Sequence, residues 1–114
     1  MEDFVPYELA VKLNEAGFNY YTKEIYEINV LLERYFEIPK PTISQVLKWL
    51  REEKLILIGL SPMQEYDVEE TIEWCAVVYK ADKQGGLSFE EEVYYESYEQ
   101  AAITGISYVL DNLI

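Results

Sequence analysis

The stretch TIEWCAVVYKADKQGGLSFEEEVYY, residues 71–95, decides the fold of this chain. Alternate positions of residues 71–80 fall on opposite faces of a strand, and one of these faces carries Ile72, Trp74, Ala76 and Val78. Residues 82–86 follow with the sequence DKQGG, whose two glycines accept the positive φ of a tight turn. The pattern predicts an antiparallel hairpin, with strands over 71–80 and 87–95.

The same alternation separates the expected buried side of the hairpin from its expected outward side. On the return strand it places Leu87, Phe89, Val93 and Tyr95 toward the core, and Glu91 interrupts this apolar series in the manner of an edge strand. The outward positions combine carboxylates with tyrosines. They form the candidate interaction surface: Glu73, Tyr79, Glu90, Glu92 and Tyr94.

Helices are predicted on both sides of this hairpin. Thr42 and Gln45 have the spacing of a capping box at the start of a helix that runs to Lys54. The apolar run 55–60 then predicts a strand and residues 61–67 a loop, and Ser97 caps a last helix that contains Gly105. A glycine inside a helix lowers helix propensity, so Gly105 is expected where this helix crosses the sheet or another helix.

The N-terminal third contains a first helix and a stretch whose pattern fits more than one kind of element. Pro6 and Gly17 suit the start and the end of a first helix over residues 6–16. In residues 19–38, Ile25, Ile28, Leu32 and Tyr35 match helical spacing, and a helix is favoured there, although parts of 24–37 also fit short strands. The whole predicts a single α+β domain over 1–114. Its antiparallel sheet has about three or four strands, helices pack on one face, and the order is αβββα from residue 42 onward.

Composition excludes several kinds of chemistry. The chain contains no His and one Cys, so it can build neither a Ser-His-Asp nor a Cys-His arrangement, and no cysteine cage for zinc. The acidic run 90–92 lies on a predicted strand and lacks the alternating ligands and the glycine of a calcium loop. We therefore predict no catalytic residues, no metal site and no cofactor, and we expect a protein that is not an enzyme.

The charge is strongly negative and unevenly distributed. The formal net charge is −13, and 12 of the 22 acidic residues lie from Pro62 onward, against two lysines. Such a surface repels phosphate backbones and favours a basic protein as partner, while a merely solvated sheet face is the alternative. The αβββα order is shared with double-stranded-RNA-binding modules, but the last helix begins Ser97-Tyr98-Glu99-Gln100 rather than with basic residues, so nucleic-acid binding is not expected.

The expected location is cytoplasmic, without membrane association. Met1 to Phe4 carry two acids and no apolar signal region follows, and no apolar run is long enough to span a bilayer. The lone Cys75 cannot form an internal disulfide, which fits a reducing compartment.

Three stretches carry a resemblance: FVPYELA (residues 4–10), PTISQVLKWLRE (41–52) and YEQAAITGISYVLDNLI (98–114). Together they resemble a family of small uncharacterised proteins from gut bacteria and their phages or mobile elements. In that family the stretch between the first helix and the second motif is usually longer than residues 19–40 here. The resemblance implies an accessory protein of mobile-element type and brings no activity, cofactor or catalytic residue.

The leading functional hypothesis is a small, acidic, non-enzymatic protein-interaction or accessory module. A sharper version is a DNA mimic, in which carboxylates take the places of phosphates and inhibit a basic host protein. A different class is a small ligand-binding or enzymatic domain that uses carboxylates and tyrosines in a pocket. A third possibility is a homodimer formed through Trp49, Trp74 or a sheet edge.

Overall fold

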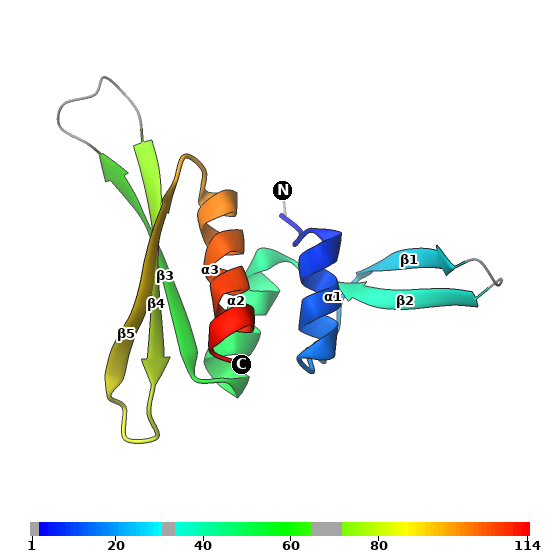
Figure 1. Ribbon diagram of the computed structural model, residues 1–114, viewed down its shortest axis with the longest axis horizontal. Coiled ribbons are helices and arrows are strands. Elements are labelled where there is room, and N and C mark those ends of the chain that lie inside the picture. The colour runs from blue at the N-terminus through cyan, green and yellow to red at the C-terminus, as the bar shows by residue number, and fades with distance from the viewer. Residues whose placement is uncertain (1–2, 31–33, 65–71) are drawn as a thin grey trace.

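A computed structural model describes residues 3–30, 34–64 and 72–114 of the chain. Within them lie three helices and two antiparallel sheets, an α+β fold (Figure 1). In chain order the elements are α1 (Tyr7–Glu15), β1 (Glu24–Val30), β2 (Arg34–Lys40), α2 (Ile43–Glu53), β3 (Ile56–Gln64), β4 (Ile72–Ala81), β5 (Leu87–Tyr95) and α3 (Tyr98–Asn112). From α2 onward the order is αβββα, as the sequence predicts.

The layers follow one another along the longest axis of the molecule. Figure 1 shows the β3-β4-β5 sheet at one end, α2 and α3 on one of its faces, α1 beyond them, and the β1–β2 hairpin projecting at the far end. The projecting hairpin explains a radius of gyration of 15.9 Å, larger than the roughly 13 Å of a compact chain of this length. No described helix is long and apolar enough to cross a membrane.

Helix α2 forms the centre of the core and begins with the predicted capping box. The Thr42 hydroxyl accepts a hydrogen bond from the Gln45 N–H at 3.2 Å, and the Thr42 N–H donates to the Gln45 side chain at 2.9 Å. Its apolar side buries Val46, Trp49 and Leu50. Because Trp49 is only 2% exposed, it belongs to the core and is not available to a dimer interface.

Helix α3 crosses the sheet at Gly105, as the sequence predicts. A Cβ atom at this position would lie 3.4 Å from Ile58 of β3 and 3.6 Å from Ala76 of β4. Ile106 and Val109 continue the buried side of the helix, and both are fully buried. The β3-β4-β5 sheet therefore has one face that α2 and α3 cover and an opposite face that they leave uncovered.

The helix favoured over residues 19–38 is wrong. Strands β1 and β2 occupy this region and pair antiparallel, with Glu27 opposite Glu37. At the base of the hairpin Ile38 is buried, and the Tyr26 hydroxyl donates to the Val5 carbonyl at 2.6 Å. The helical spacing of the isoleucines was coincidental, because β-branched and aromatic residues also fit a paired strand that packs against α1 at its base.

The strand predicted over 55–60 is longer than expected. Strand β3 continues to Gln64, so the first part of the predicted loop 61–67 is strand, and residues 65–67 lie outside the described residues. Pro62 pairs in register with Trp74, which a strand at the sheet edge tolerates because its outer side donates no ladder hydrogen bond.

Candidate functional site

The sheet face opposite α2 and α3 contains most of the predicted interaction surface. Side chains of residues that are paired across neighbouring strands point to the same face of a sheet. The register pairs of β3, β4 and β5 therefore identify the residues of this face. We call this surface the outer face; it comprises Leu57, Gly59 and Ser61 of β3, Glu73, Cys75, Val77, Tyr79 and Ala81 of β4, and Leu87, Phe89, Glu92 and Tyr94 of β5.

A β-bulge changes which residues of β5 reach the outer face. Val78 pairs with Glu91 but Tyr79 pairs with Phe89, so Glu90 is an extra residue without a partner on β4. The extra residue shifts the alternation by one, and Phe89 and Leu87 therefore turn outward with Tyr79. Their predicted place in the core is wrong, since they are 59% and 58% exposed. Val93 stays on the covered side, where it pairs with the fully buried Ala76.

Aromatic rings form one end of the outer face. The rings of Tyr79 and Phe89 meet edge to face, with centroids 6.3 Å apart. Leu57 of β3 is the register partner of Tyr79 on the side away from Phe89, and its side chain is partly buried. A large apolar side chain exposed beside another aromatic ring is typical of a contact surface.

A carboxylate network forms the middle of the outer face. The Tyr94 hydroxyl and the Cys75 thiol both donate to the same oxygen of Glu92, the thiol at 3.7 Å. Burial and the neighbouring Glu92 charge raise the pKa of the Cys75 thiol, so the thiol stays protonated and unreactive at neutral pH. Tyr94 is 48% exposed, and its ring is therefore available to a partner.

The structure brings together only part of the predicted set. Glu92 and Tyr94 are in contact, and Tyr79 lies further along the same face. Glu73 is six residues from Tyr79 on β4, about 20 Å along the strand. Glu90 lies in the bulge rather than in the outward series. The set is thus a long surface and not a pocket.

Sequence reasoning missed the most exposed apolar residues of this surface, Leu87 and Phe89. The available signal was Glu91, a charge in an otherwise apolar series, which marks the place where the alternation changes. Among the residues that the structure describes, no group of His, Cys, Asp and Glu is arranged to hold a metal ion. The described residues form hollows of about 390, 290 and 180 Å³, and none of the five predicted residues lines any of these three.

Comparisons of the chain with protein-family models, curated proteins and solved structures find no significant match.

Proposed function

We propose that this chain is a non-enzymatic interaction module that binds a basic protein through the outer face. The observation that carries the proposal is the exposure of Phe89 and Leu87, 59% and 58%, on a sheet face that no described helix covers. Figure 1 shows both α2 and α3 on the opposite face of the sheet. Because each side chain is a little more than half exposed, burying the rest of it against a partner supplies about 1–2 kcal/mol.

The charge of the outer face favours a basic occupant. Glu73 and Glu92 contribute carboxylates, and none of the outer-face positions is Lys or Arg. Long-range attraction between such a surface and a basic protein accelerates association and weakens with added salt. A second copy of the chain is disfavoured as the occupant, because each copy has a formal net charge of −13.

The partly buried tyrosines add to this interpretation. Tyr79 and Tyr94 offer large contact areas whose rings are already held, Tyr79 by Phe89 and Tyr94 by its bond to Glu92. Side chains that are ordered before binding lose little conformational entropy when a partner arrives. The outer face thus joins an apolar aromatic end with an acidic, tyrosine-bearing middle.

The test compares proteins captured from a cell lysate by the wild type, by Phe89→Ser and by the control Tyr21→Ser. Tyr21 is an aromatic residue that is 83% exposed, and its carbonyl accepts a hydrogen bond from Gln45 of α2, away from the outer face. We expect a basic protein that the wild type and the control retain and that Phe89→Ser binds at least about tenfold more weakly. Equal capture by Phe89→Ser, or no specific capture by the wild type, contradicts the proposal.

The salt dependence and the competitor distinguish versions of the proposal. Binding that weakens from low to physiological salt supports a charged interface. Displacement of the captured protein by duplex DNA would identify the outer face as a DNA mimic, whereas a partner that DNA does not displace supports an ordinary acidic docking surface.

A further inference from the structure

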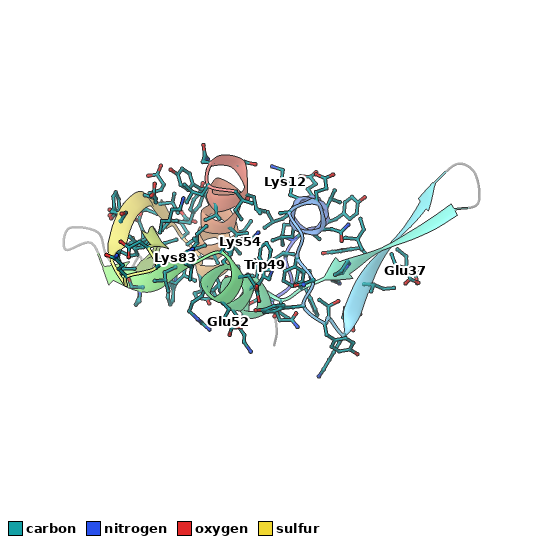
Figure 2. The ribbon with its side chains drawn as sticks, turned by 90° about the horizontal axis from the view of Figure 1, so that it is seen from below. Lys12, Glu37, Trp49, Glu52, Lys54 and Lys83 are labelled. Carbon is teal, nitrogen blue, oxygen red and sulfur yellow. The ribbon has the colours of Figure 1, made fainter. Side chains whose placement is uncertain are left out.

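A second surface has the opposite charge to the rest of the molecule. A hollow of about 390 Å³ lies between the end of α2 and the turn that joins β4 to β5. Figure 2 looks at this end of the molecule and labels Lys54, which follows α2, and Lys83, which lies in the turn. Its charged and polar lining consists of Lys54, Lys80, Lys83, Asp82 and Ser88. We call it the lysine hollow.

The lysine hollow concentrates positive charge in an acidic chain. It contains three of the nine Lys and Arg residues, and its one carboxylate belongs to Asp82. That carboxylate is engaged locally, because one of its oxygens accepts the N–H groups of Gln84 and Gly86, both at 2.8 Å. The two ion pairs found among the described residues, Lys12–Asp111 and Lys48–Glu52, use other lysines.

The backbone around the lysine hollow is tightly held. The Ala81 N–H donates to the Leu55 carbonyl at 2.7 Å, and the Asp82 N–H donates to the Gly86 carbonyl at 2.9 Å. Lys80 pairs in register with Ser88 and with the buried Ile56, so it lies on the covered side of the sheet, opposite the outer face. Lys80 and the aromatic residues of the outer face therefore lie on opposite sides of the sheet, while Ala81 belongs to both surfaces.

Leu55 adopts a conformation that glycine usually fills. Its φ is +56°, the left-handed region, directly after the end of α2. A leucine there is strained relative to glycine, and such strain at a surface position is often retained for function. The Leu55 side chain is 41% exposed and lines the hollow, so it supplies an apolar wall beside the lysines.

Lys54 also has a structural role. Its Nζ atom lies 5.4 Å from the centroid of the Trp49 ring, and its charge opposes the negative end of the α2 dipole. The anion-binding charge is therefore assigned mainly to Lys80 and Lys83, which are exposed and flank the hollow from the strand and the turn.

We propose that the lysine hollow binds a carboxylate or phosphate group, with Lys80 and Lys83 on the anion and Leu55 against the apolar part of the ligand. An ammonium group that reaches an anion forms a charge-assisted hydrogen bond with it. The long-range field of the chain opposes the approach of anions, and it repels an extended polyanion more strongly than a single phosphate or carboxylate group.

The test is an NMR titration of the full chain with inorganic phosphate, acetate and phenyl phosphate at constant ionic strength. We expect saturable shifts confined to amides of residues 54–56 and 80–88. Lys80→Gln/Lys83→Gln should weaken binding about tenfold or more, while Lys48→Gln, which removes an exposed lysine outside the hollow, should leave it unchanged. Near-UV circular dichroism verifies that each variant keeps its fold.

Leu55→Ala distinguishes binding of the anionic group from binding of the apolar part of the ligand. It should weaken phenyl phosphate while leaving inorganic phosphate unchanged, because only phenyl phosphate has an apolar group to place against Leu55. Saturable shifts with phosphate but not acetate would assign the site to phosphate groups, and the reverse to carboxylates. Shifts that do not saturate, or that persist equally in Lys80→Gln/Lys83→Gln, overturn the proposal.

Discussion

Gly105→Ala should make the protein more stable. Gly105 is buried inside α3, and an added Cβ would lie 3.4 Å from Ile58 Cγ2 and 3.6 Å from the Cβ of Ala76. These are ordinary van der Waals distances, so the methyl group fits without moving the helix. Replacing a glycine inside a helix by alanine raises the free energy of unfolding by about 1 kcal/mol. Burial of the added methyl group contributes further, by less than about 0.8 kcal/mol.

The expected gain is thus about 1 kcal/mol in the free energy of unfolding, equivalent to roughly 4 °C in the melting temperature of a domain of this size. Urea unfolding followed by far-UV circular dichroism measures it, with both curves fitted at a common m-value. Gly105→Val is the matched variant: its two further methyl groups have no room beside Ile58, and we expect a loss of about 1–3 kcal/mol.

The pair of variants tests how α3 lies on the sheet. Stabilisation by alanine together with destabilisation by valine fits a helix that contacts Ile58 and Ala76 at the described distances. If Gly105→Ala is less stable than the wild type by more than about 0.5 kcal/mol, α3 lies closer to the sheet than the 3.4 and 3.6 Å distances to Ile58 and Ala76 indicate. If valine is tolerated as well as alanine, the helix does not cross the sheet at residue 105.

Two further predictions concern Leu55 and Tyr20. Leu55→Gly should be about 1 kcal/mol more stable than Leu55→Ala in urea unfolding, because both lose the same side-chain contacts and only glycine relieves the positive φ; equal stabilities would contradict the left-handed conformation. Burial and hydrogen bonds to Glu52 and Glu53 raise the pKa of Tyr20 from 10.0 to about 12. The neutral phenol is therefore favoured by folding, and its contribution to stability is complete below pH 10 and lost as the pH rises through about 12. Tyrosine titration by NMR should show this late ionisation in the wild type, and stability should fall less steeply above pH 10 in Tyr20→Phe; a Tyr20 that ionises near 10.0 would contradict it.

Local signals made the elements from residue 42 onward predictable. The capping box at Thr42 and the glycine turn at 85–86 each act within a few residues, and both form as the sequence indicates. Gly105 marked the crossing of α3 because a helix interior seldom keeps a glycine without a close neighbour.

The N-terminal hairpin was not predictable in the same way. Its strands are stabilised by pairing with each other and by anchors distant in sequence, such as the bond from Tyr26 to the Val5 carbonyl. Helical spacing in residues 25–35 carries no information about those contacts. Spacing alone therefore favoured the wrong element.

The candidate site was predicted only in part, for a geometric reason. A single extra residue, Glu90, turns Leu87 and Phe89 from the expected core to the outer face, and the charge of Glu91 in the apolar series is the sequence signal beside it. The lysine hollow brings Lys54 together with Lys80 and Lys83. Lys54 is 26 or more residues away from the other two in the chain, and it lies beside them only because β3 pairs with β4.

An NMR footprint of the captured basic partner on the isotope-labelled chain would locate the binding surface residue by residue. We expect shifts and line broadening to concentrate on the outward positions of β4 and β5, with Phe89, Tyr79 and Tyr94 at the centre. Effects that concentrate on α1 or the β1–β2 hairpin and leave these three residues unchanged would contradict it.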